Sequence, residues 1–474
     1  MNDLEELERP HEACGVFGIY APGQDVARIT YFGLFALQHR GQESAGIAVV
    51  DGTQLLLHRE MGLVSQVFRE EEIAALRGHI AIGHTRYSTT GGSVICNAQP
   101  IVMEDPQLGP FALAHNGNLA NAVALERRLA RQGHTLETTS DSEIIAKLLI
   151  LAPGDTWEAR LRHVMPQLSA AYSLVLCTQD SLIAVRDPWA VRPLCIGQID
   201  GNWIIASETC AIDIVGGRVS REVAPGEIIR IDGVGAEHLH STQGVPERSR
   251  ASCLFEHIYF ARPDSNLGAG SLYSARQRMG RALAREYPVD ADVVISVPDS
   301  ATPAATGYAA ARGLPFADGL IKNRYVGRTF ISPDQRMRER GVYLKFNALP
   351  DVLSGKRVVM IDDSIVRGTT TRQIVQMLRQ AGAREVHIGV TSPAFRHPCY
   401  LGIDVAQAGE LIAAQQSTVE GITATIGADS LHYLSLDSLI EATGLPATHF
   451  CTGCFTGKYP VQVQEEEEIV LAGG

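Results

Sequence analysis

The segment VVMIDDSIVRGTTT, residues 358–371, constrains the fold of this chain more than any other. A short apolar run ends in two adjacent aspartates, Asp362 and Asp363, and a loop then leads through Gly368 into a helical pattern. Open α/β sheets bind ligands at the carboxyl ends of their strands. Backbone N–H groups at a helix start attract phosphate, and glycine permits a close approach. The segment therefore predicts a phosphate site at the edge of a parallel sheet.

The rest of the second half repeats this alternation of strand and helix. Apolar runs typical of strands occupy residues 292–298, 357–362 and 385–392. Helical patterns occupy residues 270–286, 301–313 and 370–381. Because parallel strands are joined by crossover helices, this order predicts an α/β domain built on a parallel sheet.

The first half consists of short strand-like runs bounded by glycine or asparagine. These runs occupy residues 14–20, 45–50, 79–84, 111–117 and 172–177. Two helical patterns, at residues 26–38 and 141–150, interrupt them. The pattern predicts an α+β domain of stacked sheets with helices outside.

A chain of 474 residues is too long for one ordinary hydrophobic core, so we expect two domains. Residues 234–250 carry little apolar periodicity and several turn or charged residues, which places the boundary there. The first domain then spans residues 14–234 and the second residues 250–460. Residues 461–474 contain a run of glutamates and are expected to form a solvated acidic tail.

Charge and composition exclude several classes of protein. The chain has 53 acidic and 41 basic residues, and its net charge of −12 argues against a surface for duplex nucleic acid. No apolar stretch approaches the roughly 18 residues of a membrane span. The acidic start of the chain lacks the order of a secretory signal. Nine scattered cysteines do not form a disulfide framework, so we expect a cytoplasmic protein without nucleic-acid or membrane partners.

The acidic pair and its loop, taken alone, also fit a capped helix after an acidic turn. The full string resembles the pyrophosphate-ribose-phosphate signature of the type I phosphoribosyltransferases. The resemblance implies that the two acids hold the ribose hydroxyls and that the loop holds the 5′-phosphate. The loop residues expected to bind phosphoribosyl pyrophosphate are Asp362, Asp363, Ser364, Arg367, Gly368, Thr369 and Thr370.

Residues 297–305 end another strand with carboxylate and hydroxyl side chains. Such oxygen atoms suit a Mg²⁺ ion on a diphosphate. We expect Ser300, Asp362 and Asp363 to ligate this ion, with Thr302 as the alternative to Ser300.

A basic stretch, KNRYVGRTF, contains Lys322, Arg324 and Arg328. A solvated basic loop is one interpretation. The other, implied by the resemblance, is a flap that binds the diphosphate through Lys322 and Arg324 and excludes water from an activated sugar.

Cys14 heads an apolar strand, a position that by itself is typical of an ordinary buried cysteine. Further segments change this interpretation because they resemble the glutaminase domain of the N-terminal-nucleophile amidotransferases. They lie at residues 33–48, 84–92, 114–122 and 140–149. The resemblance implies stacked antiparallel sheets with outer helices for the first half.

Together the two halves resemble the amidophosphoribosyltransferase family. The resemblance implies a glycosyltransferase with a glutaminase half-reaction. Such an enzyme makes 5-phosphoribosylamine from phosphoribosyl pyrophosphate, glutamine and water, the first committed step of de novo purine biosynthesis. It also implies a homo-oligomer, usually a tetramer, that purine nucleotides inhibit.

The glutaminase chemistry requires a chain end at Cys14. The thiolate must attack the glutamine amide, and a free α-amino group, with a pKa of about 7.7–8.0, is a suitable base. Residue 14 carries this group only if residues 1–13 are removed, so we expect these residues to be a propeptide.

Four further residues receive roles from the same resemblance. Arg86 pairs with the α-carboxylate of glutamine and Asp141 with its α-ammonium group. Asn116 and the backbone N–H of Gly117 form the oxyanion hole. Singly, the charges also fit a surface and Asn-Gly fits a hairpin turn. Their joint occurrence in the order of the family favours the site.

Cys451 and Cys454 form a C-x-x-C pair, and Cys253 and Cys399 bring the second-half cysteines to four. Their spacing fits Cys₄ zinc and a [4Fe–4S] cluster equally well. The resemblance favours the cluster, in a structural role. The other four, Cys96, Cys177, Cys195 and Cys210, are expected to be ordinary buried or partly buried residues.

Two other functions fit parts of the pattern. One is an amidotransferase that feeds ammonia to a different acceptor, such as a sugar phosphate, but its partner domain would lack the DDSIVRGTTT loop. The other is a ligand-sensing protein that keeps the phosphoribosyl fold as a binding module. Such a sensor would have no need of Cys14, Arg86, Asn116 and Asp141.

Overall fold

The computed structural model describes residues 14–87, 92–240, 250–323, 344–403 and 408–463. The expected propeptide, Arg324, Arg328 and most of the acidic tail lie outside these residues. None of the helices among the described residues combines the length and the apolar character that a membrane crossing requires.

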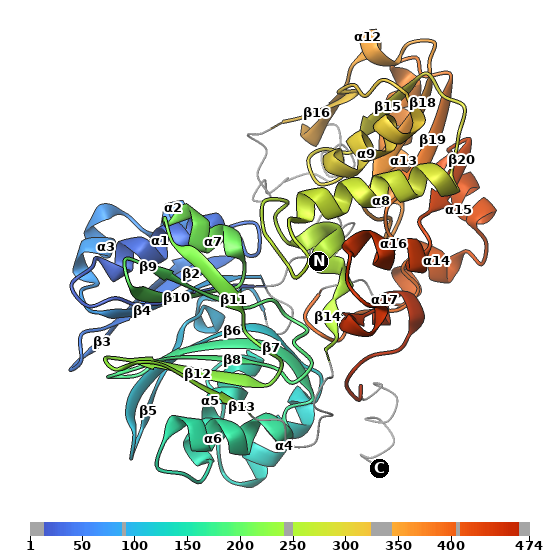
Figure 1. Cartoon of the computed structure of the whole chain (residues 1–474). Coiled ribbons are helices and arrows are strands. Elements are labelled where there is room, and N and C mark those ends of the chain that lie inside the picture. The colour runs from blue at the N-terminus through green and yellow to red at the C-terminus, as the bar shows by residue number, and fades with distance from the viewer. Residues whose placement is uncertain (1–13, 88–91, 241–249, 324–343, 404–407, 464–474) are drawn as a thin grey trace.

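Two antiparallel sheets lie face to face in the first domain (Figure 1). One has the order β11 (Arg218–Glu222), β9 (Cys195–Ile199), β10 (Asn202–Ala206), β1 (Gly15–Tyr20), β4 (Ile80–Arg86), β2 (Ser44–Val50) and β3 (Leu55–Met61). The other has the order β13 (Gly235–His240), β12 (Glu227–Asp232), β8 (Leu182–Arg186), β7 (Ala170–Cys177), β6 (Gly109–Leu119) and β5 (Ile101–Asp105).

Helices cover the outer faces of both sheets. The first sheet carries α1 (Val26–Ala36), α2 (Val64–Val67), α3 (Glu70–Ala75) and α7 (Thr209–Ile214). The second carries α4 (Ala122–Arg131), α5 (Asp141–Leu151) and α6 (Trp157–Val164). Side-chain alternation along a strand explains the layers, since Val16 of β1 packs between the sheets and Phe17 packs toward the helices. The predicted α+β fold with outer helices is confirmed.

The second domain is built on a parallel sheet. Its strands have the order β15 (Val293–Ser296), β18 (Arg357–Asp362), β19 (Glu385–Val390) and β20 (Ser430–Tyr433). One face carries α8 (Leu272–Glu286), α9 (Thr302–Arg312) and α16 (Leu436–Thr443). The other carries α13 (Thr369–Gln380), α14 (Ile412–Gln415) and α15 (Val419–Ile426). The predicted α/β fold is confirmed.

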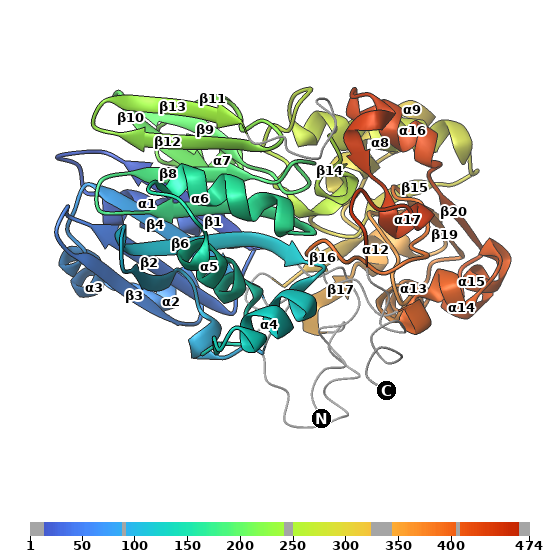
Figure 2. The same cartoon turned by 90° about the horizontal axis from the view of Figure 1, so that it is seen from below.

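Shorter elements complete this domain. An antiparallel pair is formed by β16 (Leu320–Lys322) and β17 (Phe346–Ala348), followed by α12 (Pro350–Leu353). Near the first domain, β14 (Ser252–Cys253) pairs in parallel with β21 (Phe450–Cys451), and α17 (Gly453–Thr456) follows (Figure 2). The last strand of the first-domain sheet, β13, lies within residues 234–250, the segment in which the sequence places the boundary.

Buried charges cross the contact between the domains. Arg40 of the first domain pairs with Glu208 of its own domain and, at 2.6 Å, with Glu256 of the second. Arg192 lies 3.3 Å from the same Glu256 carboxylate. All four side chains are almost fully buried. Removing one partner would leave an uncompensated charge, so the network requires the two domains to dock in register.

Candidate functional site

The predicted glutamine-site residues come together at one end of the first-domain sheets. Cys14 precedes β1 and Arg86 ends β4, and the antiparallel pairing of Gly15 with Thr85 puts the two residues side by side. Asn116 lies on β6 of the facing sheet, and Asp141 begins α5. The charges of both Arg86 and Asp141 act on the Cys14 thiol.

The Cys14 thiol is buried and protonated as the structure stands. Its Sγ lies 3.3 Å from the carbonyl oxygen of Tyr87, and the residue is 7% exposed. Burial raises the pKa of the thiol to about 11, against the smaller opposing effects of the Tyr87 backbone and Arg86. A nucleophilic thiolate at this position therefore needs an adjacent base.

Asn116 has an unusual environment. The residue is fully buried, yet neither the oxygen nor the nitrogen of its side-chain amide has a hydrogen-bond partner among the described residues. Buried polar atoms without partners are destabilising. A ligand oxygen that accepts from the amide N–H group would remove the part of this cost that belongs to the nitrogen, as an oxyanion hole requires.

Gly117 is required by its surroundings. Its φ is +153°, and a Cβ at this position would collide with the carbonyl oxygen of Ala171 on the neighbouring strand. Only glycine, which has no side chain, fits at this position, where its backbone N–H follows Asn116 directly on β6.

Asp141 is held in its ionised form. One carboxylate oxygen accepts a 3.0 Å hydrogen bond from Leu119 N–H, and the other lies 3.7 Å from His115 Nδ1. Burial works to raise the pKa of Asp141, but His115 and these hydrogen bonds outweigh it and hold the pKa below its usual value. An ionised buried carboxylate suits an ammonium group.

Arg86 is 2% exposed. Its Nη1 lies 3.3 Å from a carboxylate oxygen of Glu43 and donates to the carbonyl of Gly92 at 3.2 Å. A guanidinium is a planar fork of N–H donors, which is the geometry that pairs with a carboxylate.

Sequence reasoning missed the residues that support this site. The backbone N–H of His115 donates to Gln99 Oε1 at 2.8 Å, and Gln99 Nε2 donates to the Ser142 hydroxyl at 2.9 Å. The His115 ring nitrogen Nδ1 lies 3.1 Å from the same hydroxyl. This network fixes the strand that carries Asn116. Each member is an ordinary polar residue in its own segment, so no local signal marked it.

The predicted phosphate loop follows β18 at the edge of the parallel sheet. Asp362 accepts from the backbone N–H of Asp363 at 2.9 Å, and Asp363 accepts from the Ser364 hydroxyl at 2.7 Å. Gly368 caps α13 with a φ of +81°, a conformation that favours glycine. Thr369 and the residues after it form the first turn of that helix, whose N–H groups face the loop.

Ser300, and not Thr302, reaches the acidic pair. The Ser300 hydroxyl donates to a carboxylate oxygen of Asp363. The Thr302 hydroxyl instead lies 3.1 Å from that of Ser296. Of the two alternatives, Ser300 is therefore the one beside the predicted metal ligands.

Two of the predicted cations, Lys322 and Arg367, form ion pairs among the described residues. Lys322 Nζ lies 2.8 Å from a carboxylate oxygen of Asp299. Arg367, in the phosphate loop, pairs with Glu410. The pair of Lys322 with Asp299 is exposed, so a phosphate displaces that carboxylate at little cost, whereas the Arg367 side chain is 13% exposed.

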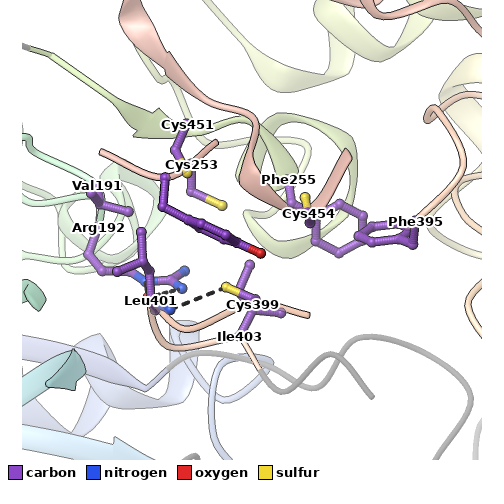
Figure 3. Close-up of a pocket in the computed structure, with 11 residues that line it drawn as sticks. Val191, Arg192, Cys253, Phe255, Phe395, Cys399, Leu401, Ile403, Cys451 and Cys454 are labelled. Carbon is purple, nitrogen blue, oxygen red and sulfur yellow. Dashed lines mark hydrogen bonds between the residues drawn. The ribbon is translucent and has the colours of Figure 1, made fainter. Parts of the chain in front are cut away.

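The four second-half cysteines line one largely apolar cavity (Figure 3). Pairing of β14 with β21 puts Cys253 directly beside Cys451. Burial is the largest cause and the nearby Cys399 a smaller one that together raise the pKa of both thiols to about 12. All nine cysteines lie among the described residues, and there each of them is free of a disulfide. Among the residues that the structure describes, no His, Cys, Asp and Glu group is arranged to hold a single metal ion.

The remaining cysteines differ in exposure. Cys177, Cys195 and Cys210 are buried, as expected, but Cys96 is exposed. It lies in a short 3₁₀ turn rather than in a strand, which explains why apolar burial was the wrong expectation for it.

Comparisons with known proteins agree with this arrangement. Residues 84–213 match the family model described as a glutamine amidotransferase domain, and residues 272–403 match a phosphoribosyl transferase domain. The chain is 52% identical over 469 residues to an amidophosphoribosyltransferase of Synechococcus elongatus, covering 98% of this chain and 94% of that one. It is 46% identical over 467 residues to the Bacillus subtilis protein of that name, covering 98% and 97%.

Solved structures give the same result. Glutamine phosphoribosylpyrophosphate amidotransferase from B. subtilis, complexed with ADP and GMP, matches with a TM-score of 0.90 and 46% identity. The match covers 96% of this chain and 98% of that one. A structure described as the allosteric regulatory enzyme of purine biosynthesis matches with a TM-score of 0.91, also at 46% identity, over 96% and 97% of the two chains.

Proposed function

The chain belongs to the amidophosphoribosyltransferase family, and from this premise we propose which of its residues perform the reaction. The enzyme makes 5-phosphoribosylamine from phosphoribosyl pyrophosphate, glutamine and water, and releases pyrophosphate and glutamate. This is the first committed step of de novo purine biosynthesis. The residue roles, cofactors, processing and assembly that follow are our proposal.

In the first domain, the Cys14 thiolate attacks the side-chain amide carbon of glutamine. Arg86 binds the α-carboxylate of the substrate and Asp141 its α-ammonium group. Asn116 and the Gly117 N–H stabilise the oxyanion of the tetrahedral intermediate. Ammonia leaves, and water then hydrolyses the γ-glutamyl thioester to glutamate. The buried, unpartnered amide of Asn116 is the observation that carries this proposal.

The base for this step is the α-amino group of Cys14 itself. The raised pKa of the buried thiol supports the need for such a base. Since residue 14 has a free amine only after cleavage, residues 1–13 are a propeptide that is removed before activity. The amine takes the thiol proton and returns it to the departing ammonia.

In the second domain, ammonia attacks C1 of the ribose and displaces pyrophosphate. Asp362 and Asp363 hold the ribose hydroxyls. The loop residues Ser364, Arg367, Gly368, Thr369 and Thr370 hold the 5′-phosphate, as the N–H groups of a helix start suit an anion. Lys322 and Arg324 approach the diphosphate. The exposed pairing of Lys322 with Asp299 supports a cation that exchanges its partner when substrate binds.

Mg²⁺ would be held by Ser300, Asp362 and Asp363. These residues fit the ion because Mg²⁺ prefers hard oxygen ligands, and the hydrogen bond from Ser300 to Asp363 keeps the oxygens together. When bound, the ion neutralises charge on the departing diphosphate.

A [4Fe–4S] cluster would attach to Cys253, Cys399, Cys451 and Cys454. The four thiols fit it because they line one cavity, and four thiolates are the ligand set of such a cluster. Neither half-reaction transfers electrons, so the group ties the C-terminal segment to the rest of the chain. We expect about four iron and four acid-labile sulfide per chain. Colourless protein with one tightly bound zinc would contradict this assignment.

Assembly and regulation follow those of the family. We propose a cytoplasmic homo-oligomer, most simply a tetramer, that purine nucleotides inhibit. The relative from B. subtilis solved with ADP and GMP supports nucleotide inhibition.

A coupled assay tests the whole proposal. We expect glutamate release to depend on phosphoribosyl pyrophosphate and Mg²⁺, with pyrophosphate formed in equal amount. Release stimulated by fructose 6-phosphate would instead indicate an amidotransferase with a sugar-phosphate acceptor. No release under any condition would favour a binding protein.

A further inference from the structure

A short segment of the second domain lies directly against the strand that carries the proposed oxyanion hole. The side-chain amide of Asn118, on β6, donates to the carbonyl oxygen of Tyr400 at 3.0 Å. Two residues further, a Cβ built on Gly402 would lie 3.0 Å from the carbonyl carbon of Gly117. The backbones of the two domains therefore touch at the hole itself.

Strand geometry makes this contact relevant to the hole. Side chains alternate along a strand, so Asn116 and Asn118 project from the same face of β6, with Gly117 between them. A hydrogen bond that fixes Asn118 therefore restrains the neighbouring amide and the N–H group between the two asparagines.

The other side of the contact is rigidly held. The guanidinium of Arg192, which is fully buried, donates to the carbonyl of Leu401 at 3.0 Å from Nε and at 2.7 Å from Nη2. The backbone N–H of Leu401 in turn lies 3.4 Å from the sulfur of Cys399 (Figure 3). The same Arg192 pairs with buried Glu256. These contacts of Arg192 restrain the segment Cys399–Gly402, which packs against β6.

We propose that Asn118 and Gly402 are positioning residues for the glutaminase half-reaction. The segment Cys399–Gly402 packs against β6 and so holds Asn116 and the Gly117 N–H at the place where the oxyanion forms. Neither positioning residue contacts glutamine. The inference rests on the proposed role of Asn116 and Gly117, and it makes the first-domain chemistry dependent on a docked second domain.

The first test is Asn118→Ala in the mature, cluster-loaded enzyme that begins at Cys14. Displacing catalytic groups by about 1 Å can cost on the order of 10²-fold in rate. Loss of one restraint should cost less, so we expect kcat for glutamine to fall about 10-fold. The KM for glutamine should change less than about twofold, because ground-state binding uses Arg86 and Asp141. Synthesis from added ammonia, which bypasses the hole, should stay unchanged.

Ser169→Ala is the matched control. Its hydroxyl also crosses the domain contact, donating to the carbonyl oxygen of Gln462 at 2.8 Å. The bond is exposed and is not made to the residues of the hole. We expect Ser169→Ala to leave both glutamine- and ammonia-dependent turnover unchanged. An equal fall in kcat for Ser169→Ala and Asn118→Ala would mean general loosening of the domains and would overturn the inference.

Gly402→Ala tests the contact from the opposite side. The φ of Gly402 is +92°, and a methyl group there would press on the Gly117 backbone. We expect a larger fall in glutamine kcat, about 10²-fold. Ammonia-dependent turnover and iron content report whether this variant has folded.

The outcomes separate this inference from the proposed function. Unchanged glutamine kcat in Asn118→Ala overturns the inference, and the proposed function still stands if Cys14→Ala lacks glutamine-dependent turnover. Retained turnover in Cys14→Ala instead removes the proposed function itself. A rise in KM without a fall in kcat would place Asn118 in substrate binding and would also contradict a positioning role.

Discussion

The two proposed sites of this molecule differ in how far their cations are exposed to solvent. In the first domain, Cys14, Arg86, Asn116 and Asp141 are all at most 7% exposed. In the second, the predicted cation Lys322 has a side chain that is 36% exposed, and its partner Asp299 is 80% exposed. Glutamine carries no net charge, so a dry preformed site can receive it. A diphosphate is highly anionic, and burying unpaired cations in advance of it would be costly.

Cys14→Ala should give the largest difference between the glutamine-dependent and the ammonia-dependent activity. Without the thiol, glutamine-dependent synthesis should fall at least ~10⁴-fold, since removal of a nucleophile costs this much or more. Ammonia-dependent synthesis should persist, because the second domain is untouched. Parallel assays with glutamine and ammonium chloride measure both. Equal loss of the two activities would mean that the sites are not chemically separate.

Asp363→Asn changes the second-domain site and should lower both activities together. This variant removes one charge from the proposed Mg²⁺ and ribose site while leaving an isosteric side chain. We expect both glutamine- and ammonia-dependent synthesis to fall about 10³-fold, the upper range for a single group that acts in a transition state. The Mg²⁺ concentration for half-maximal rate should also rise. Normal ammonia-dependent turnover would show that Asp363 has no part in the reaction.

Arg86→Lys should weaken glutamine binding with little effect on chemistry. Lysine keeps the positive charge but loses the planar fork that pairs with a carboxylate. We expect the KM for glutamine to rise about 10-fold with kcat nearly unchanged, the signature of lost ground-state binding. Initial rates over a range of glutamine concentrations measure both constants. A fall in kcat alone would argue that Arg86 does not hold the substrate carboxylate.

The smallest effect concerns the pH dependence of stability in the first domain. His84 is fully buried, its Nε2 lies 3.0 Å from the His115 carbonyl, and burial lowers its pKa to about 3. In the unfolded chain its pKa is about 6.5, so below that pH the unfolded state binds the extra proton. Stability should fall as the pH decreases, by about 2 kcal/mol at pH 5 from this group.

His84→Asn should therefore reduce the difference in melting temperature between pH 7 and pH 5. His163→Asn, on the exposed face of α6, is the control and should leave that difference as in the unsubstituted protein. A pH dependence that is the same in all three proteins would contradict the assignment of this effect to His84.

Local patterns predicted both folds and much of the candidate site. The strand, acidic pair and Gly368 loop occupy one continuous segment, so their sequence order already dictates their geometry. Strand alternation and helical periodicity likewise gave β1, β18, α8 and α13 to within a few residues.

What the sequence could not provide depends on contacts between distant segments. The network of Gln99, His115 and Ser142 needs three separate elements, and no one of them carries a signal alone. The contact of Gly402 with Gly117 depends on how two domains dock, which neither hydrophobic pattern specifies. The direct pairing of Cys253 with Cys451 likewise follows from a two-residue strand that periodicity cannot detect.

The first residue of the active protein tests the central claim most directly, because the proposed base, the α-amino group of Cys14, exists only after residues 1–13 are removed. Intact-mass measurement of purified, glutamine-active enzyme should show a chain that begins at Cys14, without residues 1–13. A fully active chain that still begins at Met1 would contradict the account.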